Sequence, residues 1–328
     1  MKKFIKLVII FFIIFGVGFF VMYNNFSKSI VVKEQKIIEI KEGDNFYSLS
    51  NMLKIDKNLF KIYLKFNPPS FDLQKGKYVI KEKSSLGNVI KQLQNPINED
   101  IQITFLEGWN VYDIDEKLSQ MGLIKKEEFI EKVTHNFKNF QQDFAFLEKI
   151  ETLEGFLYPD TYNINPSSFT LDGLIYKMLK NFQDKVISKG EKKYSSKELL
   201  EIIILSSIVE KEEKNPSEKA TVSGILKKRL DEGWMLGADA TVCYPHKLTS
   251  EECKMVVSKY IGEKNDYNTR TMVGLPITPI SNPSAETIFA TMNSKSSPYY
   301  FYLHGSDGTI HYAVDNAGHE ANKSKYLK

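Results

Sequence analysis

The chain has 328 residues, 42% of them hydrophobic and 26% charged, which is the composition of a globular protein of about two domains. Its formal net charge is +3, and lysine supplies nearly all of the basic residues because the only arginines are Arg229 and Arg270. Nucleic-acid-binding proteins usually concentrate basic charge on one face and use arginine for paired contacts with bases. The composition therefore excludes nucleic acid as an expected partner.

The N-terminus carries the clearest topological signal. Three lysines within residues 2–6 precede an uncharged apolar segment, Leu7–Tyr23, which as a helix would rise roughly 26 Å, enough for a thin bilayer. No small-residue cleavage site follows this segment, which argues against a removable signal peptide. We therefore expect residues 1–26 to form a cytoplasmic tip and an uncleaved, single-pass transmembrane signal-anchor in the inner membrane, with the rest of the chain on the periplasmic, extracytoplasmic side.

Residues 37–98 have the pattern of a small α+β subdomain. An alternating apolar strand begins at Ile37, two short helices follow, Pro68 ends the second of them, and a further strand and helix close the unit. This order loosely resembles the LysM type of glycan-binding fold. A spacer domain of α+β type is an equally good interpretation.

Residues 101–328 are expected to form a larger, mixed α/β domain, so that the fold class of the whole chain is α+β. Periodicity predicts helices at the following ranges: 171–189, 195–214, 216–232 and 284–293. Residues 237–283 are rich in loops, and a β-hairpin and a polar helix end the chain. Because apolar residues surround most of the 195–214 helix, we expect it to be buried at the centre of the domain.

The central helix ends in the sequence Glu-Lys-Glu-Glu, residues 210–213. At 100° per residue, Leu199, Ile203 and Glu210 fall on one face of this helix. Burial disfavours the charged form of a carboxyl group and raises its pKa, so Glu210 could deliver a proton near neutral pH, as a general acid must. The alternative is a solvated helix end in which Glu210 pairs with Lys214, one turn later.

Other kinds of catalytic site lack their motifs in this sequence. The five histidines and two cysteines form no His-Glu-x-x-His and no Cys-x-x-Cys pattern. Neither a Gly-x-Ser-x-Gly nor a Ser-x-x-Lys motif is present, and no Gly-rich phosphate loop appears. We therefore predict no metal and no cofactor, which leaves carboxylate chemistry.

Five segments, in their order and spacing, resemble the YceG-like family of membrane-bound endolytic murein transglycosylases. They read LEGFLYPDTY, SSIVEKEE, LGADATV, YNTRTMVGLPITPISNPSAETI and GHEAN. The resemblance covers residues 37–328 and is strongest over residues 153–322, which implies a YceG-like catalytic domain at residues 101–328. In that family the glutamate of the I-V-E-K-E segment is the catalytic acid, which implies this role for Glu210.

The same resemblance implies a substrate-binding cleft around Glu210. The residues expected to shape it or to contact sugar are Glu154, Tyr158, Asp239, Tyr267, Asn268, Thr269 and Asn282. Each has a structural alternative: Asp239, which might otherwise orient Glu210, is also suited to cap a turn, and Tyr267 to pack in the core. Ala238 and Ile277 depart from the Gln-Thr-Asp-like and Gly-Pro-Pro-like versions expected in the family, so the flanking subsites differ from its pattern.

The implied reaction cleaves the bond between N-acetylmuramic acid and N-acetylglucosamine. Glu210 would protonate the bridging oxygen and then take the proton of the muramyl 6-hydroxyl, which attacks C1 of its own sugar and leaves a 1,6-anhydro end. Because this nucleophile is intramolecular, no second carboxylate is required. The expected partners are nascent peptidoglycan glycan strands and the cell-wall synthesis machinery.

Two alternatives to this reaction stay open. One is a muramidase-type glycoside hydrolase, in which Asp239 would activate a water molecule. The other is a non-catalytic cell-wall-binding protein that uses only the subdomain at residues 37–98.

Cys243 and Cys253 are the only cysteines, ten residues apart and between two of the matched segments. A pair of this kind in an oxidising compartment is compatible with a disulfide. Pro245 favours a compact turn that would bring the two residues together. We therefore expect a disulfide, the alternative being two free thiols packed as small apolar side chains.

Overall fold

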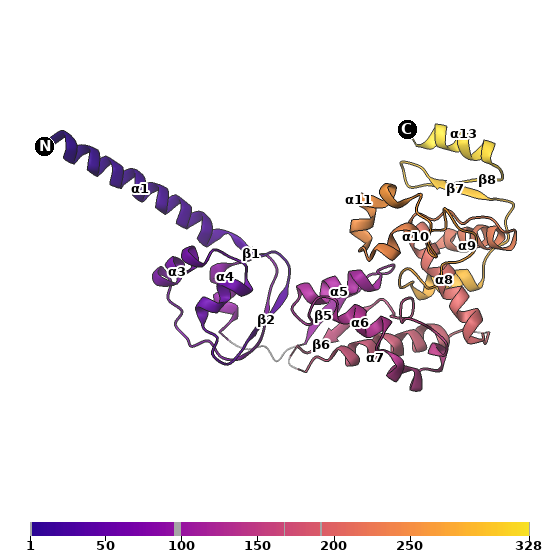
Figure 1. Cartoon of the computed structure of the whole chain (residues 1–328), viewed down its shortest axis with the longest axis horizontal. Helices are drawn as coiled ribbons and strands as arrows, with labels where there is room; N and C mark the ends of the chain where they lie inside the picture. Colours follow the sequence, from indigo (N-terminus) through magenta and orange to yellow (C-terminus); the bar gives the residue numbers. More distant parts are fainter. Residues whose placement is uncertain (1, 95–99, 167, 191, 328) are drawn as a thin grey trace. The chain divides into compact units, whose positions relative to one another are not determined.

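The computed structural model describes residues 2–94, 100–166, 168–190 and 192–327, with side chains from Ile14 onward (Figure 1). These residues form a mixed α+β fold that divides into two compact units. Unit 1 contains Met1–Ile101, Leu118–Lys125 and Ile164–Phe169. Unit 2 contains Gln102–Lys117, Lys126–Asn163 and Thr170–Lys328.

Helices dominate both units, and the strands pair two by two as β1–β4, β2–β3, β5–β6 and β7–β8. The first elements are α1 (Lys2–Lys28), β1 (Ile30–Val32), β2 (Lys36–Ile40), α2 (Leu49–Met52), α3 (Lys57–Phe66), β3 (Gly76–Ile80), β4 (Ser84–Ser85) and α4 (Leu86–Gln92). The next are β5 (Ile101–Thr104), α5 (Val111–Gln120), α6 (Glu128–Thr134), β6 (Thr161–Ile164), α7 (Leu171–Phe182), α8 (Ser196–Glu212) and α9 (Pro216–Asp231). The last are α10 (Ala240–Cys243), α11 (Ser250–Tyr260), α12 (Ala285–Met292), β7 (Phe301–His304), β8 (Ile310–Ala313) and α13 (Asn316–Tyr326).

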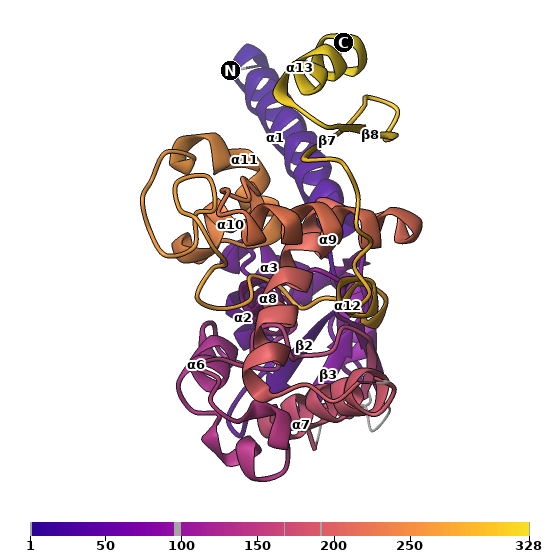
Figure 2. The same cartoon turned by 90° about the vertical axis from the view of Figure 1, so that its right-hand side faces the viewer.

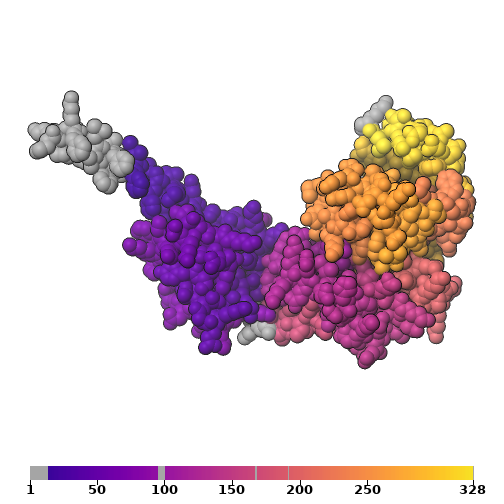
Figure 3. Space-filling view, viewed as in Figure 1, coloured from indigo at the N-terminus to yellow at the C-terminus, as the bar shows by residue number. Residues whose placement is uncertain are grey.

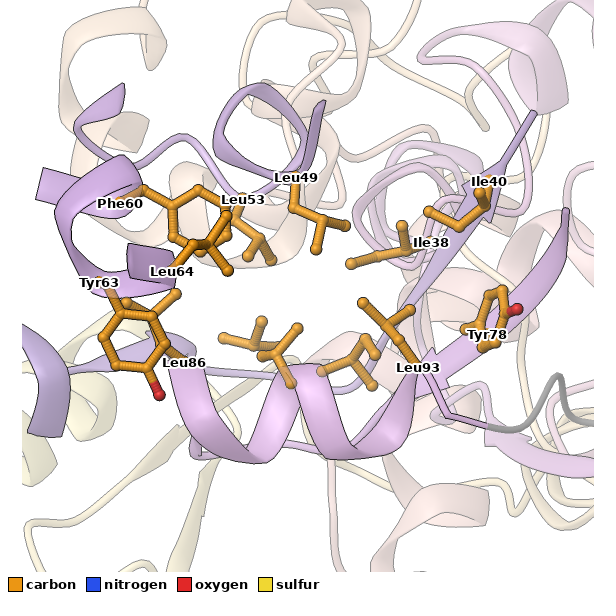
Figure 4. Packing of buried hydrophobic residues seen from close by; sticks show 13 residues of the cluster. Ile38, Ile40, Leu49, Leu53, Phe60, Tyr63, Leu64, Tyr78, Leu86 and Leu93 are labelled. Atoms are coloured by element: carbon orange, nitrogen blue, oxygen red, sulfur yellow. The ribbon is translucent and has the colours of Figure 1, made fainter. Parts of the chain in front are cut away.

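Unit 1 has its own hydrophobic core between one hairpin and its helices. Strands β2 and β3 are antiparallel, with Ile38 opposite Tyr78. Their inward side chains meet Leu49 of α2, Phe60 of α3 and Leu86 of α4 (Figure 4). The order of strands and helices predicted for residues 37–98 is therefore present in the part of this range that the structure describes.

Helix α1 has two kinds of surface along its length. Its large exposed side chains are Ile14, Phe15, Val17, Phe20, Val21 and Met22. In contrast, Tyr23 and Phe26 pack on the core of unit 1. Searched over the described residues, the structure contains no helix long and apolar enough to cross a membrane. Residues 7–13 of the predicted span lie outside the residues whose side chains are described.

Helix α8 is the centre of unit 2, as the sequence predicts. It begins with a capping box in which the Ser195 hydroxyl accepts from the Glu198 N–H and the Glu198 carboxylate accepts from the Ser195 N–H. Beyond this first turn nearly every apolar side chain is buried, and Ile203 and Ile208 are 0% exposed. The helix is therefore surrounded by protein and gives a rigid support to whatever its last turn carries.

Helices α9 and α12 pack against α8 and against each other (Figure 2). Helix α9 begins with Pro216 at its first position, where a missing N–H costs nothing. Helix α12 begins after Ser284, whose hydroxyl caps the helix by accepting from the Thr287 N–H. These two helix starts bring their first turns to the end of α8.

The C-terminal segment adds a hairpin and a helix to unit 2. Strands β7 and β8 are antiparallel, with Tyr302 opposite Tyr312, and α13 packs on both strands. This segment, yellow in Figure 3, lies at the surface beside the orange segment that contains α10 and α11. The hairpin and the final helix predicted from the sequence are therefore present.

Candidate active site

Glu210 lies in the last turns of α8, and polar groups from two other helices enclose its carboxylate. The Lys219 ammonium, near the start of α9, lies 3.0 Å from Oε1. Oε2 accepts hydrogen bonds from the Ser284 N–H and hydroxyl, both at 2.8 Å, and from the Thr287 hydroxyl at 2.5 Å. Because only 6% of the Glu210 side chain and 3% of the Lys219 side chain are exposed, the ion pair is almost completely buried.

These surroundings favour the ionised form of Glu210. Burial raises the pKa of this carboxyl, but hydrogen bonds from Thr287 and Ser284 and the charge of Lys219 outweigh burial and hold the pKa below its usual value. The positive end of the α12 dipole adds to the effect because the Ser284 N–H points at the carboxylate. Glu210 is therefore a carboxylate at neutral pH.

The apolar face of α8 predicted a raised pKa for Glu210, whereas the surroundings of this carboxyl in the structure lower its pKa. That prediction was wrong because a helical wheel contains only the neighbours within one helix, whereas the cation and the donors come from α9 and α12. The alternative of a solvated helix end is not found either. Glu210 pairs with Lys219, and the described part of the chain shows no ion pair between Glu210 and Lys214.

The other two carboxylates of this helix end are also held by the protein. The Glu212 carboxylate accepts from the Tyr302 hydroxyl at 2.9 Å, and the Glu213 carboxylate lies 3.1 Å from the His304 ring. Both partners lie on β7. The acidic cluster that ends α8 thus fastens two further elements, the C-terminal hairpin and α12, to the central helix.

Glu154 and Asn282 form a second, deeper cluster. One oxygen of the Glu154 carboxylate accepts from the Val111 N–H at 2.9 Å and from the Tyr244 hydroxyl at 3.0 Å. The other accepts from the Asn282 side-chain N–H₂ at 2.7 Å, while the Asn282 side-chain oxygen Oδ1 accepts from the Gly155 N–H at 2.8 Å. Both side chains are buried and bond to protein groups. This arrangement favours a role in joining loops over the predicted contacts with sugar.

Burial dominates the titration of Glu154. It raises the pKa of this carboxyl to about 8, although hydrogen bonds from Val111 and Tyr244 act in the opposite direction. Gly155, the next residue, has φ +88° and packs so closely on α8 that an added Cβ would lie 2.6 Å from Ile203. The loop that carries Glu154 is therefore fixed directly on the central helix.

Asn268 and Thr269 also face the protein interior, and both are 0% exposed. The Asn268 amide donates to the carbonyl groups of Ile261 and Glu263. The Thr269 hydroxyl accepts from the Ala238 N–H at 3.0 Å. These bonds tie the loop after α11 to the loop before α10, so the predicted contacts of Asn268 and Thr269 with sugar are not favoured by their positions.

Asp239 is the most open of the predicted site residues, with 53% of its side chain exposed, and it pairs with Arg270. The described residues include no hydrogen bond or ion pair between Asp239 and Glu210. Tyr267 is half-buried, and its hydroxyl lies 2.8 Å from the Thr278 hydroxyl.

Tyr158 is also half-buried, and the Lys185 ammonium lies 4.8 Å from the centre of its ring. Burial raises the pKa of the Tyr158 phenol, and the nearby charge of Glu107 contributes in the same direction. Tyr158 is therefore near Glu107, a carboxyl that was not among the predicted site residues.

Cys243 and Cys253 form a disulfide that joins α10 to α11, with their Cα atoms 5.6 Å apart. The pair lines a cavity of about 230 Å³ together with Lys211, Asp239 and Tyr244. In the described ranges, no three His, Cys, Asp or Glu side chains are grouped as a metal site requires.

Three residues that contact Glu210 were not predicted from the sequence: Lys219, Ser284 and Thr287. Ser284 carried a usable signal because it is the first residue of the helix predicted at 284–293, and a serine at a helix start exposes its N–H there. No pattern marked Lys219, since its distance from Glu210 depends on how α9 folds back on α8.

The chain is similar in sequence to a known family and to named proteins of two bacteria. A family model described as the YceG-like family matches residues 38–325. An endolytic murein transglycosylase of Streptococcus pneumoniae is 26% identical over 327 residues, covering 90% of this chain and 59% of that protein. Its namesake in Bacillus subtilis is 25% identical over 307 residues, covering 88% and 84%. The chain thus spans about three fifths of the streptococcal relative.

The fold is also similar to a solved one. A crystal structure of a YceG-like protein from Listeria monocytogenes superposes with a TM-score of 0.57 at 21% identity, covering 88% of this chain and 99% of that one. The family model spans both units of the chain, including the Glu210 and Glu154 clusters. The chain belongs to the YceG-like family.

Proposed function

We propose that this protein is a peptidoglycan lytic transglycosylase that cuts within glycan strands and leaves a 1,6-anhydromuramyl end. The name shared by its relatives, endolytic murein transglycosylase, supports the proposal. The observation that carries it is the Glu210 carboxylate, fixed at the end of a rigid helix by Lys219, Ser284 and Thr287.

Glu210 acts through its negative charge. As the glycosidic bond breaks, positive charge develops at C1 of the muramyl sugar, and a preorganised carboxylate stabilises that charge in the transition state. The muramyl 6-hydroxyl attacks C1 from within the same sugar, and its proton passes through the Glu210 carboxylate to the bridging oxygen that leaves, so water and a second nucleophile are not needed. The loops joined by Glu154 and Asn282 act as positioning groups that keep Ser284 against Glu210.

Membrane anchoring is part of the proposal. The apolar segment Leu7–Tyr23 and the exposed apolar side chains of α1 from Ile14 to Met22 support a single-pass anchor. An anchor would hold unit 2 near newly made glycan strands and the cell-wall synthesis machinery. The α+β core of unit 1 supports a LysM-like glycan-binding role for this unit.

Analysis of the products tests the reaction. Full-length protein in detergent is incubated with uncrosslinked glycan strands, once in ordinary water and once in water labelled with heavy oxygen. The masses of the released fragments are then measured by mass spectrometry. Anhydro ends without heavy oxygen are expected. Reducing ends that carry heavy oxygen would instead indicate the muramidase alternative, and intact strands that remain bound would indicate a wall-binding protein.

Topology has its own test. Protease added to spheroplasts is expected to digest nearly the whole chain and leave a short N-terminal fragment. Protection of units 1 and 2 would contradict an extracytoplasmic location.

A further inference from the structure

A groove of about 510 Å³ lies at the end of α9 that is remote from Glu210. Helices α9 and α12 both begin beside Glu210, where Lys219 and Ser284 contact its carboxylate, and they pack against each other (Figure 2). Between Lys219 and Asp231 helix α9 rises roughly 18 Å, so the groove is separate from the Glu210 site. The side chains that line the groove include Lys227, Lys228, Asp231, Glu232, Ser296 and Ser297.

Direct contacts between α9 and the segment after α12 fix the shape of this groove. Gly224 of α9 packs so closely that an added Cβ would clash with the Lys295 carbonyl. The Lys295 N–H donates to the Ala220 carbonyl at 2.9 Å. The hydroxyls of Ser223 and Ser294 lie 2.8 Å apart and join the same two segments. The groove is therefore a preformed feature of unit 2, as ligand-binding sites usually are.

The polar groups of the groove indicate what kind of ligand it suits. The Ser297 hydroxyl oxygen is buried and has no hydrogen-bond partner among the described residues, a cost that a ligand with its own polar groups can remove. The formal charges cancel, since Lys227 and Lys228 are balanced by Asp231 and Glu232. The groove therefore suits an uncharged ligand that is rich in hydroxyl and amide groups.

An exposed tryptophan lies beside the groove. Trp234 is 43% exposed and stacks on Tyr300, with the two ring centres 5.0 Å apart. Two groove residues hold Tyr300: the Glu232 carboxylate accepts from its hydroxyl at 2.9 Å, and the Lys228 ammonium lies 3.6 Å from its ring centre. The Trp234 N–H donates to the Arg229 carbonyl at 2.7 Å, which fixes the backbone. A rigid aromatic face next to polar groups is the combination that binds a sugar ring.

We propose that Trp234 and this groove form a second saccharide-binding site, remote from Glu210. One sugar ring stacks on the indole of Trp234, and a neighbouring sugar bonds to the polar groups of the groove, including the Ser297 hydroxyl. The identity of the saccharide, an amino-sugar glycan strand, rests on the proposed function. A strand that is bound here and cut at Glu210 must continue for several sugars beyond the cut. The site therefore favours cleavage within a strand over removal of its end units.

The fluorescence of Trp234 tests binding without any cleavage. The chain has two tryptophans, so Trp109→Phe leaves Trp234 as the reporter. Full-length Trp109→Phe protein in detergent is titrated with an oligomer of N-acetylglucosamine, which contains no muramyl bond to cut, and a saturable change in fluorescence is expected. Adding Ser297→Ala should weaken binding about three- to tenfold because a buried hydrogen bond is lost. Adding Ser258→Ala, at an exposed position of α11, is the matched control and should leave binding within about twofold.

Substitution of the aromatic face tests its part in cleavage. Trp234→Leu is expected to raise KM for long glycan strands about three- to tenfold because the stacked sugar is lost. Trp234→Phe keeps an aromatic ring and should recover part of this loss. Met255→Ala removes an exposed apolar side chain of α11 and should change KM by less than about twofold. A cooperative melt like that of the wild type checks that each variant is folded.

Two outcomes would overturn the proposal. If the fluorescence of Trp234 does not change up to the solubility limit of the oligomer, or if Ser297→Ala and Ser258→Ala bind it equally, the groove is not a saccharide site. If Trp234→Leu and Met255→Ala have the same KM for long strands, the indole does not hold the strand. In either case the proposed function stands when the wild type makes anhydro ends. A wild type that makes no anhydro ends but binds the oligomer at Trp234 contradicts the proposed function alone.

Discussion

Glu154 and Glu210 are both almost completely buried carboxyls of unit 2, yet their surroundings shift their pKa in opposite directions. The donors that Glu154 accepts from among the described residues are neutral, and burial raises its pKa to about 8. Glu210 has the Lys219 ammonium at 3.0 Å and three donor groups at the start of α12, and its pKa is lowered. Hydrogen bonds to the charged form and a nearby cation can therefore together outweigh burial in setting the charge of a buried carboxyl.

The Glu154 cluster and the Glu210 cluster also differ in their position within unit 2. The Glu154 cluster lies inside the unit and joins the loops at Val111, Gly155 and Asn282 to one another. The Glu210 cluster lies at the end of α8, where the loop that contains Gly108 packs against it. We therefore expect a structural role for Glu154 and a chemical role for Glu210, and the substitutions below test this difference.

Glu210→Gln is expected to have the largest effect. Cleavage of glycan strands should fall by about 10³-fold or more because the negative charge beside C1 is lost. The free energy of unfolding should also fall by about 3 kcal/mol, since Lys219 keeps its charge in a site where 3% of its side chain is exposed. Product assays and urea unfolding measure the two effects.

A second substitution separates the two effects of Glu210→Gln. Adding Lys219→Met removes the unpaired ammonium, so the double variant should regain most of the lost stability and none of the activity. If Glu210→Gln alone unfolds at the urea concentration of the wild type, the buried ion pair is not what holds α9 to α8.

Gly155→Ala is expected to destabilise the protein by about 3 kcal/mol. The added methyl group would lie 2.6 Å from Ile203 and 2.7 Å from Pro279, and φ +88° is strained for alanine. Thermal unfolding measures the loss. Gly233→Ala, at φ +73° with open space around its Cβ, is the matched control and should lose only the part due to backbone strain. Equal losses at both positions would show that the contact with α8 contributes nothing.

Glu154→Gln should cost about 1–2 kcal/mol at neutral pH because an amide N–H₂ would face a donor that now bonds to an oxygen of the Glu154 carboxyl. The dependence of stability on pH tests Glu154 more specifically than the size of the loss does. With a pKa raised from 4.5 to about 8, Glu154 in the folded protein holds a proton that the unfolded chain has lost, so its contribution to stability decreases as pH rises through this window.

The variant should therefore lack a decrease in stability that the wild type shows between about pH 4.5 and 8. Glu210 has the opposite sign, because its lowered pKa makes its contribution disappear as pH falls below its usual value of 4.5. Denaturant unfolding at several pH values measures both. Parallel pH profiles for the wild type and Glu154→Gln would contradict the raised pKa of Glu154.

Asp239→Asn should have the smallest effect. Its partner Arg270 is exposed, so the pair is worth less than about 1 kcal/mol of stability. Activity should fall far less than in Glu210→Gln, because Asp239 makes no described contact with Glu210. A loss as large as that of Glu210→Gln, with heavy oxygen in the products, would favour the hydrolase alternative.

Local interactions explain why the sequence alone predicted most elements. Ser195 and Glu198 cap α8 within one turn, Pro216 starts α9 at its first position, and Ser284 caps α12. The burial of α8 also follows from its own apolar residues. The family motifs identified Glu210 for the same reason, since each motif is a continuous segment of sequence.

Only the tertiary structure decided the charge of Glu210 and the orientation of the predicted site residues. Lys219 and Ser284 reach Glu210 because α9 and α12 fold back on α8, and no periodicity within one helix contains that information. Asn268 and Asn282 looked like polar groups on loops, yet both bond inward because loop backbone that is buried must find hydrogen-bond partners. The electrostatic energy of a carboxyl depends on every charge and donor within a few ångströms, and folding alone brings those groups together.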